Sequence, residues 1–109
     1  MYVSVTRTKD PLDQPFELAR IAGEEMAPWH LQIEGFEGLL VLSNATEGAT
    51  LVLTFWESRE IADAHRHARM EFRDRVTSVV GVEVVETIGF EVAFAELGPR
   101  IAELGGGTS

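Results

Sequence analysis

The chain has 109 residues, a length that fits one domain with a limited core. Its 18 acidic and 9 basic residues give a net charge of −9, a poor match to nucleic acid and to anionic membrane surfaces. The absence of cysteine excludes disulfides, thiolate catalysis and cysteine metal sites. The sequence has no leader pattern and no apolar run of membrane length, so we expect a cytoplasmic protein without a membrane partner.

The N-terminal segment predicts a strand. Residues 2–8 alternate, with Val3 and Val5 on one face and Ser4 and Thr6 on the other.

A turn over residues 10–15 leads into the first predicted helix, with Asp13 as a candidate N-cap. Residues 16–33 have helical spacing. Their apolar stripe consists of Ala19, Ala22, Met26, Trp29 and Ile33, with Leu18 and Ile21 beside it. Pro28 removes a backbone donor inside this run, so we expect a kink or break near residues 24–27.

The middle of the chain predicts a β-hairpin. A turn at residues 34–38 precedes a strand at 39–42, and a polar loop at 43–49 leads to a strand at 51–56.

A second helical region follows, and Ser58 is its predicted N-cap. We expect one or two helical pieces that reach about Val80, where Gly81 ends them. The predicted buried face consists of Ile61, His65, Ala68, Phe72 and Val76. The last strand is predicted over residues 82–94, with a bulge at Gly89.

The predicted order is β-α-β-β-α-β, an α+β ferredoxin-like fold with an antiparallel sheet. The two hairpin strands barely alternate, because Thr54 is their only polar residue over residues 39–42 and 51–55. Both faces of the hairpin therefore require burial, whereas two helices can cover only one face. We expect a second copy to cover the other face, which gives a homodimer in the form of an α/β barrel.

Several motifs resemble the antibiotic biosynthesis monooxygenase family. The segments that carry the resemblance are Gly35-Phe-Glu-Gly38, Leu51-Val-Leu-Thr-Phe-Trp56-Glu-Ser58, Glu60-Ile-Ala-Asp-Ala-His65 and Phe90-Glu-Val-Ala-Phe94-Ala-Glu-Leu97. The resemblance covers residues 1–97 and leaves residues 98–109 as a flexible C-terminal tail. It implies a dimeric ferredoxin-like α/β barrel, in agreement with the argument from burial.

The resemblance also implies activities. Some members are cofactor-free oxygenases of polycyclic aromatic phenols or anthrones, and in these the pocket tryptophan corresponds to Trp56. An asparagine four residues before it and a tyrosine six residues after it are also used, but Val52 and Ala62 stand here. Other members degrade haem with a tryptophan, a histidine and an asparagine, where this chain has His65, Asp74, and Thr6 or Arg7. Haem degradation is therefore not expected.

His65 is the acid–base candidate, because an imidazole titrates near neutrality and can accept a phenolic proton. The alternative is a core histidine, just as Trp56 is either a pocket wall or a core residue. His65 and His67 cannot chelate one ion, because helical residues two apart do not face each other, so no metal is expected. The remaining candidate substrate contacts are Trp29, Met26, Phe72 and Arg7, with a core role for Trp29 and Met26 and a solvated one for Arg7 as alternatives.

The sequence thus predicts a cofactor-independent monooxygenase of an aromatic small molecule, in which Trp56 and His65 are the catalytic candidates. The alternative is a non-catalytic dimeric barrel that binds a hydrophobic metabolite or serves as a structural subunit, and Val52 and Ala62 favour it. A third alternative is haem binding without degradation, for which His65 is the candidate ligand.

Overall fold

The computed structural model describes residues 1–10 and 15–105. The candidate N-cap Asp13 and the last four residues of the predicted tail lie outside these ranges. The elements are β1 (Tyr2–Lys9), α1 (Pro15–His30), β2 (Phe36–Asn44), β3 (Ala49–Trp56), α2 (Arg59–Ala64), α3 (Arg66–Val80), β4 (Glu83–Glu91) and α4 (Pro99–Glu103). Apart from the added α4, this is the predicted order, and the second helical region consists of two pieces, one of the two outcomes that the sequence predicted.

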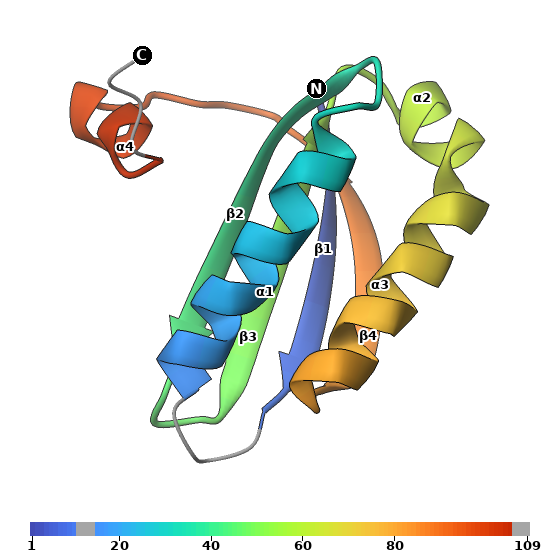
Figure 1. Ribbon diagram of the computed structural model, residues 1–109. Coiled ribbons are helices and arrows are strands. Elements are labelled where there is room, and N and C mark those ends of the chain that lie inside the picture. The colour runs from blue at the N-terminus through green and yellow to red at the C-terminus, as the bar shows by residue number, and fades with distance from the viewer. Residues whose placement is uncertain (11–14, 106–109) are drawn as a thin grey trace.

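The strands form one antiparallel sheet in the order β2-β3-β1-β4. Both α1 and α3 lie on the same face of this sheet and leave the other face without a helix (Figure 1). The α+β ferredoxin-like fold is therefore confirmed. The sheet of one chain is open, so the closed barrel expected from a second copy stays a prediction.

Helix α1 differs from the prediction at Pro28. The helix does not break near residues 24–27 but continues through Pro28 to His30, and the amide of Leu31 still donates to Ala27 O at 2.9 Å. Pro28 lacks only its own amide donor, and the helix ends two residues later at His30. Few other backbone hydrogen bonds of the helix are therefore affected. Ile33 lies beyond the helix, and the buried face of α1 consists of Ala19, Met26 and His30.

The second helical region follows its predicted local signals. The hydroxyl of Ser58 accepts from the amide of Ile61 at 3.2 Å, as an N-cap does. The helix divides at His65, and Gly81 ends α3 in the left-handed conformation with φ 74°. The predicted buried face is wrong at Ala68, which is exposed, whereas Arg69 next to it is buried.

The two faces of the sheet carry different side chains. Strand register places Thr6 beside Val52 and Thr87 on the face that the helices cover. The uncovered face carries Val3, Val5, Leu40, Leu53, Phe55, Ile88 and Phe90. The threonines of β1 therefore point toward the helices, while its valines point toward the face that no helix covers.

Strand β4 ends at Glu91, three residues earlier than predicted, and the chain then runs in irregular conformation to α4. Helix α4 lies apart from α1 and α3 (Figure 1). The predicted bulge at Gly89 is wrong, because the register shift falls where Arg7 and Thr8 face Glu86 and Val84. Gly89 serves a different purpose: a Cβ there would lie 1.6 Å from the hydroxyl oxygen of Tyr2.

Candidate functional site

A cavity lies between the helical layer and the sheet. Its interior volume is about 60 Å³, and its open mouth adds empty space that is shared with solvent. The interior is therefore narrow. The helices contribute mainly apolar side chains to its wall, namely Leu18, Ala19, Ala22, Met26, Met70, Phe72, Val76 and Val80.

The floor of the cavity is the covered face of the sheet, and much of it is polar. Its hydroxyl groups belong to Ser4, Thr6, Thr8, Thr50 and Thr54. At one end the buried carboxylate of Asp10 accepts from the hydroxyl of Thr8 at 2.7 Å and from that of Thr50. Ser4 lies six residues before Asp10, and a strand rises about 3.3 Å per residue, so the two ends of this polar row are about 20 Å apart.

His30 lies at the other end of the cavity and is 6% exposed. Its Nδ1 lies 2.9 Å from the carbonyl oxygen of Met26. A carbonyl can only accept, so Nδ1 carries the proton and Nε2 is the acceptor of the neutral ring. Burial lowers the pKa of His30, and the positive charge of Arg69 acts in the same direction. The imidazole is therefore neutral at pH 7 and can accept a proton at Nε2.

Arg69 is the second ionisable group at this end and is 8% exposed. Its guanidinium lies over the indole of Trp56, 4.7 Å from the ring centroid, and Nη1 donates to Ala62 O at 2.9 Å. Burial lowers the pKa of Arg69, while Tyr2 and Asp63 act in the opposite direction. No carboxylate of the described residues lies within 4.0 Å of its nitrogens.

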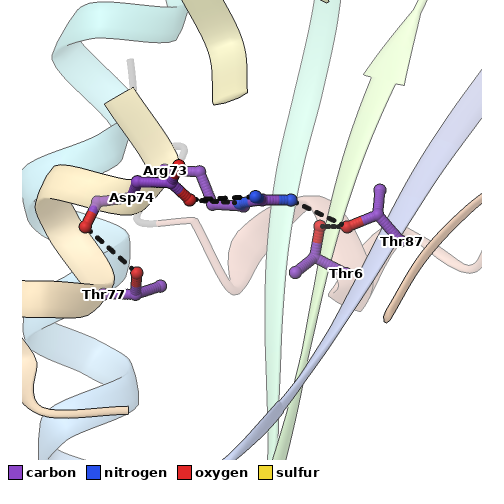
Figure 2. A network of polar contacts seen from close by, with 5 residues as sticks. All are labelled: Thr6, Arg73, Asp74, Thr77 and Thr87. Atoms are coloured by element: carbon purple, nitrogen blue, oxygen red, sulfur yellow. Dashed lines mark hydrogen bonds and ion pairs between the residues drawn. The ribbon is translucent and has the colours of Figure 1, made fainter. Parts of the chain in front are cut away.

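Arg73 also lines the cavity, but its charge is paired. Its Nη2 lies 2.9 Å from Asp74 Oδ1, and Nη1 donates to the hydroxyl of Thr87 at 3.1 Å. Thr87 in turn lies 3.1 Å from the hydroxyl of Thr6 (Figure 2). Arg73 thus connects α3 to β4 and, through Thr87, to β1.

The two catalytic candidates from the sequence lie behind or beside the cavity wall. Trp56 is fully buried, and its Nε1 donates to the hydroxyl of Thr54 at 2.9 Å. It does not line the cavity, but it supports two groups that do, Arg69 and His30. His65 is half-buried at the junction of α2 and α3 and does not line the cavity either.

The other predicted contacts divide into two pairs. Met26 and Phe72 line the cavity. Trp29 does not; it stacks on Phe72 with ring centroids 4.5 Å apart and so packs one helix against the other. Arg7 is exposed at the uncovered face of the sheet, in a shallow depression separate from the cavity.

Sequence reasoning missed His30, Arg69 and Asp10. The spacing of four residues from Met26 could have identified His30, because helical residues i and i+4 share a face. The burial of Arg69 has no comparable local signal, since charged residues on helices are usually solvated. Asp10 was assigned to a turn, and only the pairing of β1 with β3 brings Thr50 to it.

Over residues 1–10 and 15–105, no group of three or more metal-binding side chains could hold a metal ion. Within the same ranges, no helix has the length and apolar character that crossing a membrane requires.

Comparison of the sequence finds no matching protein-family model and no similar curated protein. Solved structures do match. A monooxygenase of Streptomyces coelicolor in complex with nanaomycin D has a TM-score of 0.67 and 17% identity, over 89% of this chain and 91% of that one. A protein of Deinococcus radiodurans, provisionally assigned as an antibiotic biosynthesis monooxygenase, has a TM-score of 0.66 and 16% identity, over 89% and 97%.

A variant of MhuD with two manganese protoporphyrin IX molecules per active site has a TM-score of 0.64 and 21% identity, over 90% of this chain and 100% of that one. At these identities the matches establish the fold, and the activity must be argued from the site. The resemblance to antibiotic biosynthesis monooxygenases is thereby confirmed at the level of the fold.

Proposed function

We propose that the cavity binds an electron-rich aromatic small molecule and that the protein oxygenates it without a cofactor. One observation carries the proposal: a neutral, buried histidine lines a narrow cavity whose helical wall is apolar. Apolar walls favour a flat hydrocarbon ring, and an acceptor nitrogen suits a phenolic proton. The likeness in fold to a monooxygenase that was solved with nanaomycin D is compatible with this proposal.

The proposed reaction divides the work between the substrate and His30. The imidazole Nε2 accepts a proton from the phenol or its keto tautomer, and the ring anion supplies the electrons to molecular oxygen. One oxygen atom bonds to a ring carbon, which loses its hydrogen, and the other leaves as water, so that an anthrone yields an anthraquinone. Apolar walls exclude bulk water from the anion while it reacts. In this scheme His30 takes the role that the sequence assigned to His65.

We also propose that the functional unit is a homodimer. The uncovered face of the sheet carries apolar side chains, among them Leu42 and Ile88, which are 47% and 45% exposed. A contiguous apolar face of this kind is typical of an interface. A second copy is the partner that closes two open sheets into one barrel, as the sequence predicted.

Oxygen uptake with anthrone as substrate tests the proposed activity. The wild-type protein should consume one O₂ per anthraquinone formed, and His30→Ala should lower turnover by about 100-fold or more. The matched control is His67→Ala, because His67 is exposed on α3 and pairs with Glu71. His65→Ala tests the candidate from the sequence and should leave turnover nearly unchanged. If His30→Ala keeps full turnover while circular dichroism shows a native fold, His30 is not the base.

A non-catalytic binding function is the alternative. Val52 lines the cavity, and Ala62 is fully buried, so neither position offers the polar group that the oxygenases of the resembled family use there. Retention of an aromatic ligand without oxygen uptake, in native mass spectrometry and in the assay above, would favour this alternative. Haem binding through His65 has less support, because His65 does not line the cavity.

A further inference from the structure

Arg69 has more hydrogen-bond donors than the protein uses. A guanidinium carries five N–H donors, and in the described residues only Nη1 of Arg69 has a partner, the carbonyl of Ala62. The one buried side-chain polar atom without a partner in those residues is the hydroxyl of Ser43. The remaining nitrogens of Arg69 are therefore not sealed in the core, and Arg69 is part of the cavity wall.

A buried cation with no carboxylate of the described residues within 4.0 Å of its nitrogens is an unusual arrangement. Charges that leave water are normally paired, because an isolated ion loses much of its hydration free energy. The other arginine in the wall, Arg73, follows this rule through Asp74. Arg69 has no such ion pair among the residues that the structure describes. The indole of Trp56 and the carbonyl of Ala62 hold its guanidinium in place. A side chain so fixed is preorganised to bind an anion that enters the cavity.

We propose that Arg69 is the anion-binding residue of the cavity and that its ligand is a planar aromatic carboxylate. The guanidinium fork matches a carboxylate with two parallel hydrogen bonds, and one positive charge balances one negative charge. Phe72 and Met26 supply apolar contacts for a ring, and Asp10 at the far end repels the acid group. The carboxylate therefore binds beside Arg69 and His30. This inference rests on the proposed function for the role of the cavity, and it adds the charge and orientation of the substrate.

The test compares two probes of one shape, 2-naphthoic acid and its neutral amide, 2-naphthamide, by calorimetric titration of the full chain at pH 7. The wild-type protein should bind the acid at least about tenfold more tightly than the amide, because charge-assisted hydrogen bonds are about twice as strong as neutral ones. Arg69→Met keeps an apolar stem without the charge and should abolish this preference. The matched control is Arg66→Met, which removes the same charge from an exposed position one turn earlier.

A second variant covers the case in which Arg69→Met does not fold. Arg69→Lys keeps the charge but loses the fork, so it should reduce the preference for the acid without reversing it. Equal affinity of the wild-type protein for acid and amide, failure of the acid to bind, or an unchanged preference in either folded Arg69 variant would overturn the inference. The oxygen-uptake assay separates it from the proposed function. Acid binding without turnover supports Arg69 alone, whereas turnover of neutral anthrone with no acid preference supports the oxygenase alone.

Discussion

The rings of Trp29 and Phe72 lie nearly parallel, with 4.5 Å between their centroids and 7° between their planes. This stack joins α1 to α3 next to the cavity wall. Aromatic pairs contribute about 0.5–1.5 kcal/mol beyond the area that they bury. A double-mutant cycle with Trp29→Leu and Phe72→Leu should therefore give a coupling free energy of about 1 kcal/mol in urea unfolding. Additive single-variant effects would show that the two rings merely fill space.

The neutral state of His30 predicts a loss of stability in acid. Burial lowers its pKa in the folded state below the unfolded value of about 6.5. The unfolded chain therefore binds the proton first, and the free energy of unfolding falls as the pH drops below about 6.5, until the folded pKa is passed.

Urea unfolding at pH 7.5 and pH 5.0 measures this loss. The wild-type protein should lose more stability between these pH values than His30→Gln, whereas His67→Gln should behave like the wild type because His67 is exposed. Equal pH dependence of the wild type and His30→Gln would contradict a depressed pKa.

Gly89 predicts a steric effect at the edge of the sheet. A Cβ at this position would lie 1.6 Å from the hydroxyl oxygen of Tyr2 and 2.4 Å from its Cζ, so the whole ring would have to move. Gly89→Ala should destabilise the fold by about 1–3 kcal/mol, as overpacking usually does. Gly98→Ala is the control, because a Cβ there has no described atom within 4 Å. Tyr2→Ala should relieve the clash in the double variant, and no relief would point to a backbone cause.

The uncovered sheet face predicts an effect of charge on assembly. Ile88→Lys or Leu42→Lys introduces a charge into the proposed interface and should convert the dimer to a monomer in analytical ultracentrifugation. Val79→Lys is the matched control, because Val79 is 86% exposed on α3, the helix that covers the opposite face. A wild-type protein that sediments as a monomer at micromolar concentration would refute the dimer.

The fold could be predicted from the sequence where the signals were local. The N-cap at Ser58 and the stop at Gly81 depend on side-chain and backbone chemistry within a few residues, and both are confirmed. The continuation of α1 through Pro28 could not be read in this way, because propensity alone indicates a break there.

The candidate site was less predictable than the fold. Alternation correctly grouped Ser4 with Thr6, but it could not say whether the helices cover the hydroxyls or the valines. In the structure they cover the hydroxyls, and this choice makes the cavity floor polar. Arg69 is a second case, because its burial depends on a contact with Trp56, thirteen positions earlier in the chain. When the residues of a site come from different helices and strands, the spacing within any one element does not predict that they meet.

The narrowness of the cavity has a kinetic consequence. A flat aromatic ring that enters this narrow interior should displace wall side chains into other rotamers. Met26 and Met70 are suited to this role, since an unbranched thioether side chain has several accessible rotamers. The association rate should then rise steeply with temperature and remain below the diffusion limit, whatever the charge of the ligand.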